Sequence, residues 1–239
     1  MDNKDLQLNA QMKSSLFIVG DERIPLLVID NLFINPQQLI NLACGDSEQN
    51  YHQQSSDYYP GIRKITPINY HRQISQLFPL FKTTFGLVNA TKADIIMSAF
   101  SLTTTPVAQL RPIQMLPHVD TPADNQLAMV HYLCDKEHGG TSLYRHKSSG
   151  FERISTARHA AYRQQIKQQA IAENLHKKPK YIEGDTGLFK QIHSVEARMN
   201  RAVIYPSNVL HSGDIRPKMG LLSEPTQGRL TISSFISIR

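Results

Sequence analysis

The sequence has few cysteines, no long apolar run and no leader-like start, and each absence narrows the class of protein. The 239 residues include two cysteines, Cys44 and Cys134, too few for a framework of disulfides. No stretch stays apolar for the roughly 18 residues that a membrane-spanning helix requires. Residues 1–5 lack the basic start and apolar run of a signal peptide. We therefore expect a cytoplasmic protein with reduced thiols and no membrane partner.

The overall composition is that of a folded protein. Hydrophobic residues make up 40% and charged residues 19% of the chain, which argues against extended disorder. A chain of this length can bury a sizeable core as one domain. We expect a single domain over residues 1–239, with strands and supporting helices in 1–92 and a β-rich core in 93–239.

The positive charge is concentrated in one segment. The net charge is +6, and nine of the 26 Lys and Arg residues lie between Arg145 and Lys180, where the only carboxylates are Glu152 and Glu173. Two interpretations remain open. The segment is either a solvated helical face or a contact for an acidic partner such as nucleic acid.

The N-terminal part contains both strand-like and helix-like patterns. Residues 16–19 and 24–30 are apolar runs on either side of a polar turn, which predicts two strands. Asn35 before Pro36 predicts a capped helix that ends at Gly45. A later apolar stripe has helical spacing but contains Pro79, so we expect two short helices or a bend. This stripe consists of Ile74, Leu77, Phe78, Phe81 and Phe85.

From residue 93 onward the pattern changes to short runs of β-forming residues separated by proline and glycine. Seven or so strands at this spacing predict a sandwich or a barrel, so the fold class is mainly β with flanking helices. One helix, predicted over 156–175 with Ser155 as its N-cap, interrupts the series and should lie outside because its apolar stripe is narrow. The predicted strands are 94–104, 107–116, 126–134, 141–146, 186–193, 201–206 and 229–238.

Three residues form a candidate metal site. His118 and Asp120 are two positions apart, so in an extended segment their side chains point to the same face. His211, 93 residues further on, is the candidate third ligand. Two imidazoles and one carboxylate on one face of an octahedron suit Fe(II) and leave three positions for oxygen and a co-substrate. His131, His138, His146 and His193 are expected to be ordinary surface or core histidines.

The order of these motifs resembles a known superfamily, the 2-oxoglutarate- and Fe(II)-dependent dioxygenases on the double-stranded β-helix, or jelly-roll, fold. Its signature is His-X-Asp, then a distal His, then an Arg on the last strand, and here His118-Val119-Asp120, His211 and Arg229 follow in that order. The run 118–122, then His131-Tyr132-Leu133 and Gly139-Gly140, is similar to prolyl-hydroxylase-type members. Residues 25–30 through 59–63 resemble an uncharacterised bacterial group of the same superfamily.

The resemblance implies roles for individual residues. His118, Asp120 and His211 would hold iron, and Arg229 would pair with the distal carboxylate of 2-oxoglutarate. Arg supplies a planar fork of donors for this purpose. Thr231 and Tyr132 would contact the same co-substrate. The chain would then be an oxygenase that hydroxylates an unidentified small-molecule or peptide substrate and releases succinate and CO2, with 93–239 as the jelly-roll core and a basic helical insertion at about 155–176.

Several alternatives remain open. The chain could instead be a non-catalytic jelly-roll protein that binds a metal or another ligand, or an oxygenase whose basic segment contacts a polynucleotide. The aromatic loop from Asp57 to Arg63 either closes a surface or covers a pocket.

Overall fold

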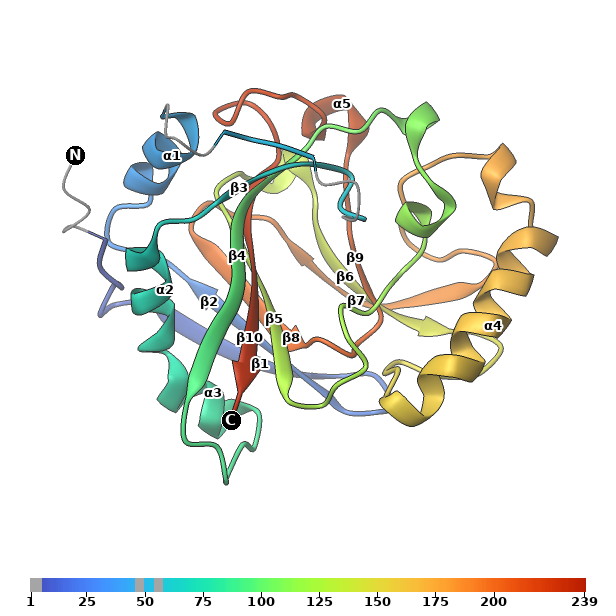
Figure 1. The fold of residues 1–239 in the computed structure, drawn as a ribbon, viewed down its shortest axis with the longest axis horizontal. Coiled ribbons are helices and arrows are strands. Elements are labelled where there is room, and N and C mark those ends of the chain that lie inside the picture. Colours follow the sequence, from blue (N-terminus) through green and yellow to red (C-terminus); the bar gives the residue numbers. More distant parts are fainter. Residues whose placement is uncertain (1–5, 46–49, 54–57) are drawn as a thin grey trace.

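The computed structural model describes residues 6–45, 50–53 and 58–239, and over these residues the chain is mainly β with flanking helices (Figure 1), as predicted. Ten strands form two antiparallel sheets in the described residues. The large sheet has the order β1-β2-β8-β5-β10-β4-β3 and the small sheet the order β7-β6-β9. The strands are β1 (Lys13–Val19), β2 (Ile24–Asp30), β3 (Gly61–Ile65), β4 (Ala93–Thr103), β5 (Gln126–Tyr132), β6 (Gly140–His146), β7 (Phe189–Glu196), β8 (Arg201–Pro206), β9 (His211–Gly213) and β10 (Leu230–Ile238).

Alternation along the strands of the large sheet produces two separate cores. On β5, Leu127 and Met129 join an outer cluster, whereas Ala128 and Tyr132 join an inner one. The inner cluster also contains Leu143 of the small sheet, so the two sheets pack face to face. The period of two in the sequence therefore corresponds to two apolar layers.

Short helices cover the outer face of the large sheet. They are α1 (Gln37–Cys44), α2 (Ile68–Ser75) and α3 (Phe78–Thr84). Pro79 lies in the first turn of α3, so the predicted stripe is divided into two pieces. Tyr70, Ile74 and Phe81 are buried against the outer cluster. No helix in the described part of the chain is both long enough and apolar enough to cross a bilayer.

The small sheet is covered on its outer side by α4 (Thr156–Ala172), seen at the right of Figure 1. Tyr162 is the buried residue of this helix and packs in a third cluster with Tyr144 and Phe189 of the small sheet. Ser155 is the N-cap residue, as predicted, although its side chain makes no capping hydrogen bond. A one-turn helix, α5 (Pro217–Gly220), precedes β10.

Four local predictions are wrong. Segment 107–116 forms two 3-10 turns, Val107–Gln109 and Pro112–Met115, because Pro112 within it and Pro106 just before it lack the amide donor that a strand needs. Residues 61–63, predicted as turn, belong to strand β3. No strand was predicted at His211, but this residue opens the short strand β9, separate from the predicted strand 201–206. Helix α1 has Pro36 at its N-cap with no side-chain cap, so Asn35 does not serve as predicted.

A buried polar network joins the outer helices to β5. The Asn200 side-chain oxygen accepts from the Phe33 amide at 3.0 Å and lies 3.2 Å from His131 Nε2, so this ring nitrogen is the donor. His131 Nδ1 then accepts from the Tyr70 hydroxyl at 3.3 Å. All bonding of this ring requires the neutral tautomer, and burial lowers the pKa of His131 to about 4. His131 is thus a core histidine, as expected.

We predict that this histidine makes the protein sensitive to acid. Below pH 6.5 the unfolded chain binds a proton at residue 131 that the folded chain does not bind until about pH 4. The free energy of unfolding should fall across this window by about 3 kcal/mol from this residue alone. In His131→Gln this part of the pH dependence should disappear, as measured by urea unfolding at several pH values. The exposed His176→Gln variant is the control, and identical slopes in the wild type and His131→Gln would contradict the assignment.

Candidate metal centre

A cavity of about 600 Å³ opens between the two sheets. Its walls come from the inner faces of β5 and β10 on one side and of β6 and β9 on the other. Polar side chains line it where a sandwich core would be apolar. Among the lining residues are Ala128, Val130, Thr141, His211, Ser212, Thr231, Ser233 and Phe235.

Backbone pairing brings the two distant histidines together. The His118 amide donates to the His211 carbonyl and the His211 amide to the His118 carbonyl, both at 2.9 Å. This isolated antiparallel bridge extends the edge of the small sheet at β9. The two ring centroids consequently lie 4.4 Å apart.

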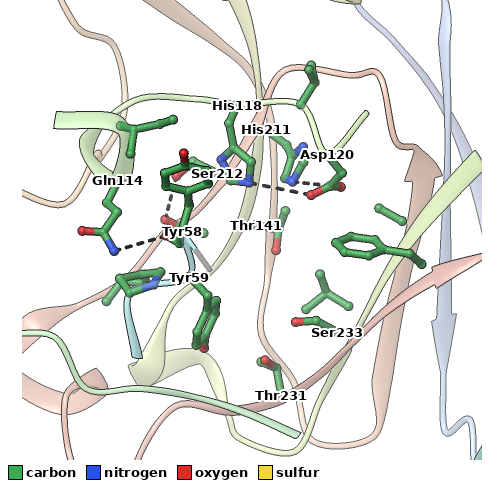
Figure 2. Close-up of a pocket in the computed structure, with 18 of the residues that line it drawn as sticks. Tyr58, Tyr59, Gln114, His118, Asp120, Thr141, His211, Ser212, Thr231 and Ser233 are labelled. Carbon is green, nitrogen blue, oxygen red and sulfur yellow. Dashed lines mark hydrogen bonds and ion pairs between the residues drawn. The ribbon is translucent and has the colours of Figure 1, made fainter. Parts of the chain in front are cut away.

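Asp120 completes the group from the same segment. Its amide donates to the Ser207 carbonyl at 2.9 Å, which fixes the backbone two residues beyond His118. Asp120 Oδ1 lies 3.9 Å from His118 Nε2, and Asp120 Oδ2 lies 3.6 Å from His211 Nε2. Figure 2 shows the three side chains pointing toward one another, with Thr141 below them. The predicted triad is therefore assembled, with one ligand atom of each residue within 4.8 Å of the others.

Protonation states favour cation binding. His211 Nδ1 donates to the Val209 carbonyl at 2.9 Å, so Nε2 presents its lone pair to Asp120. Burial lowers the pKa of His211 to about 4. The pKa of His118 is lowered too, by partial desolvation at the cavity wall and then by the proximity of His211, although 48% of this side chain is exposed. Burial also raises the pKa of Asp120 to about 6, against the effect of His118 and Arg63. Near neutral pH the group is thus two neutral imidazoles and mostly a carboxylate.

The donor set fits a metal ion. Asp120 Oδ2 is buried, only 14% of the side chain is exposed, and this oxygen has no hydrogen-bond partner in the described residues. A buried carboxylate oxygen without a donor is costly unless a cation compensates it. Cis ligands of an octahedral ion stand about 3 Å apart, so the ligand atoms, now up to 4.8 Å apart, would have to close by roughly 1 to 2 Å through side-chain rotation when an ion binds.

Arg229 lines the same cavity and is buried, with 4% exposed. Its Nη2 donates to the Gly140 carbonyl at 2.8 Å, and its Nε has no acceptor in the described residues. Burial alone lowers the pKa of Arg229, but the nearby Tyr59 and other polar groups more than offset this and hold the pKa above its usual value. A buried guanidinium with no ion pair among the described residues leaves room for an anion.

Of the other two predicted co-substrate contacts, Thr231 lines the cavity and Tyr132 does not. Thr231 lines the cavity, although its hydroxyl is 3.3 Å from the Ser101 carbonyl and can donate to it. Tyr132 does not line the cavity, because its hydroxyl donates to Thr141 Oγ1 at 2.6 Å. Thr141 therefore stands between Tyr132 and the cavity, with its own hydroxyl hydrogen available. In this structure the Tyr132 hydroxyl is hydrogen-bonded to Thr141 and does not line the cavity.

Two further residues, Thr141 and Tyr205, line the cavity and were not predicted from the sequence. Thr141 follows the Gly139-Gly140 turn directly, and this turn was the signal that could have identified it. Tyr205 is almost fully buried, and its ring centroid lies 4.8 Å from that of His211. Its inward position follows from the alternation in β8, but no motif distinguished it from core.

Part of the aromatic loop covers the cavity. Tyr58, Tyr59 and Arg63 line it, and the Arg63 guanidinium lies over the Tyr59 ring at 4.6 Å. Asp57, at the start of the predicted loop, lies outside the described residues. Of the two interpretations of this loop, covering a pocket is the one that these contacts favour. The remaining histidines, His138, His146 and His193, do not line the cavity.

We predict that Asp120 is required for metal binding. Replacing Asp120 with Asn removes the anionic ligand, and affinity for Fe(II) or Co(II) should fall at least 100-fold, as measured by anaerobic calorimetry. Stability should not fall, because Oδ2 makes no hydrogen bond in the described residues. Asp94→Asn, at the start of β4, is the control for loss of a carboxylate. Unchanged metal stoichiometry in Asp120→Asn would refute the site.

We predict that the glycine turn beneath Arg229 tolerates no side chain. Gly139 has φ +95°, and a Cβ there would meet the Asp214 carbonyl oxygen at a distance no atom pair sustains. Gly139→Ala should lower the free energy of unfolding by about 3 kcal/mol or more. Gly150→Ala is the matched control, with φ +72° and nothing within 4 Å, and should cost about 1 kcal/mol from backbone strain alone. Equal costs in thermal unfolding would show that the turn is not constrained.

The chain matches a known protein family over most of its length. No curated protein matches the chain. A family model described as "Family of unknown function (DUF6445)" matches residues 10–236, a span that includes all three ligands and Arg229. The match extends over nearly the whole sequence, and the chain therefore belongs to the DUF6445 family.

Proposed function

We propose that this protein is a non-heme Fe(II)- and 2-oxoglutarate-dependent oxygenase with a jelly-roll core. It converts a C–H bond of its substrate to C–OH, with O2 and 2-oxoglutarate consumed and succinate and CO2 released. The proposal rests on one observation: the candidate metal ligands and a buried arginine line the same cavity. A two-histidine, one-carboxylate group lies at its wall, and a buried arginine without a counter-ion in the described residues lines the same space.

The ligand set supports iron over other common metals. Two imidazoles and one carboxylate leave three open positions on an octahedral ion, which a structural zinc site does not need. When bound, Fe(II) supplies oxygen activation. The protein holds the three ligands on sheet-bound backbone, and burial keeps the His211 imidazole neutral.

Arg229 supports a dicarboxylate co-substrate. Its free Nε and its position in the wall provide donors for a carboxylate that enters the cavity. Thr141 and Thr231 line the same cavity and offer hydroxyl groups. The arginine and the metal ligands line one cavity, so a dicarboxylate bound there would have access to both.

The path of the chain supports the jelly-roll assignment. From β4 onward the segments alternate between sheets: β4 is in the large sheet, the His118 bridge extends the small one, β5 returns to the large one and β6 to the small one. After β7, strands β8, β9 and β10 alternate again. Such winding of one chain between two antiparallel sheets is the feature expected of a double-stranded β-helix.

The basic segment gives less support to a polynucleotide substrate. Arg145 pairs with Glu152 and Asp21, and Arg158 pairs with Glu22. These two guanidinium groups are neutralised within the protein and are not presented as a phosphate-binding stripe.

The proposal is tested by succinate formation. Protein loaded with Fe(II) should convert 2-oxoglutarate to succinate at a slow rate even without substrate, and His211→Ala should abolish this turnover. Arg229→Lys should raise KM for 2-oxoglutarate at least tenfold while metal affinity is unchanged, because Lys cannot form the bidentate contact. The exposed Arg216→Lys is the control. Bound iron and 2-oxoglutarate with no decarboxylation would indicate a non-catalytic binding protein, and an unchanged KM in Arg229→Lys would remove the arginine from the site.

A further inference from the structure

A second hollow lies beside the metal centre, between α4 and the segment that carries His118. It measures about 450 Å³. We call it the α4 groove. His118, Val119, Ile113 and Arg163 line both the cavity and the groove, so the two spaces adjoin at the metal ligand. The groove is lined by Pro112, Ile113, Leu116, Pro117, His118, Val119, His159, Tyr162, Arg163, Ile166, Lys167, Ala170, Ile171 and His176.

The floor of the groove is apolar. Ile166, Ala170 and Ile171 of α4 face proline and aliphatic side chains of segment 112–119. Two of the isoleucines, Ile113 and Ile171, are exposed by 45% and 63%, so this apolar surface is accessible to a ligand. The α4 residues of the lining, from His159 to Ile171, extend over about 18 Å at the rise of a helix. An elongated apolar chain fits this shape.

The polar lining of the groove is cationic. Its charged members are Arg163 and Lys167, both exposed, and the lining contains no carboxylate among the described residues. Arg163 and Lys167 form no ion pair with the described residues, unlike Arg145 and Arg158 of the same basic segment. Charge complementarity therefore selects an anionic ligand.

Tyr162 adds an independent sign of a ligand. Its side chain is almost completely buried, with 6% of the residue exposed, and it lines the groove. Its hydroxyl has no hydrogen-bond partner in the described residues. A buried hydroxyl of this kind costs free energy unless a bound molecule supplies the partner.

These features distinguish among classes of ligand. A peptide would need partners for its backbone amides and carbonyls, and the apolar floor offers none. A single-stranded polynucleotide would need aromatic rings on which its bases stack, and the one tyrosine of the lining is buried in the helix interface. An aliphatic chain with a single anionic group requires only what the groove contains.

We propose that the α4 groove binds an aliphatic carboxylate, with its chain on the apolar floor and its head group held by cationic side chains of α4. The ligand is the substrate of the oxygenase, and its chain reaches the metal ligand His118 where the two spaces adjoin. Its role as substrate rests on the proposed function, whereas its binding does not.

The binding is tested on the full-length, metal-free protein with dodecanoate below its micellar concentration. Calorimetry should detect saturable binding of dodecanoate, and no comparable binding of dodecylamine or acetate. In the double variant Arg163→Glu, Lys167→Glu the affinity for dodecanoate should fall at least tenfold, and added salt should weaken binding to the wild type. Lys178→Glu, an exposed lysine outside the lining, should change the affinity by less than twofold.

Tyr162→Phe separates a ligand contact from a structural role. Because the hydroxyl has no partner in the described residues, its removal should leave thermal stability unchanged or slightly higher, while affinity for dodecanoate falls several-fold. A loss of stability in Tyr162→Phe would show that the hydroxyl is used within the protein. This outcome would overturn the tyrosine contact even if the groove binds the ligand.

The outcomes separate this inference from the proposed function. Absence of binding, equal binding of dodecylamine, or preference for an acidic peptide would overturn the groove assignment, even where the iron-loaded protein forms succinate. If the charge variants weaken dodecanoate binding as expected, but dodecanoate does not stimulate succinate formation in an active holoenzyme, the site is confirmed and the substrate role is overturned. Stimulation by dodecanoate that is lost in the double variant would support both parts.

Discussion

Two backbone hydrogen bonds between His118 and His211 are the constraint on which the metal centre depends. They join segments that are 93 residues apart in sequence, and each has a length of 2.9 Å. Residues directly opposite each other in an antiparallel pair present side chains to the same face, and position i+2 presents a third there. Asp120 occupies that position and is anchored by the Ser207 carbonyl. The three ligands thus derive their positions from sheet geometry, which requires little ordering of side chains when an ion binds.

The fold separates the residues that stabilise it from those that line the cavity. The outer face of the large sheet and helices α1 to α3 form the largest apolar cluster, and α4 covers the small sheet with another. The inner face can therefore hold Thr231, Ser233 and a buried Arg229 at the cavity without loss of the main core. Where the inner face is apolar, around Val203 and Leu143, it keeps the sheets together beside the opening.

The parts that sequence predicts well are those set by local periodicity. Short runs of β-forming residues bounded by turn residues identified β2, β5, β8 and β10, and Pro79 correctly divided a helical stripe. The i, i+2 spacing of His118 and Asp120 also sufficed to place both on one face. Features that depend on pairing partners were not readable: β9 has three residues, too few for a pattern, and β3 became a strand only by pairing with β4. The partner of the Tyr132 hydroxyl was not readable for the same reason, because Thr141, which accepts its hydrogen bond, comes from the opposite sheet.

The basic segment illustrates why charge must be read together with packing. Arg145 and the backbone amides of Asp21 and Glu22 converge on Glu152, which is fully buried, so part of the positive charge fastens the β1–β2 turn to the small sheet. An arginine paired in this way attracts an anionic ligand only weakly, because the opposite charge of its carboxylate partner is close and shielded from water. The charge that remains on α4 lies at Arg163 and Lys167, along the wall that leads to His118. The sequence shows one cationic stretch, but the fold assigns one portion to holding the sandwich together and the other to the approach to the metal ligands.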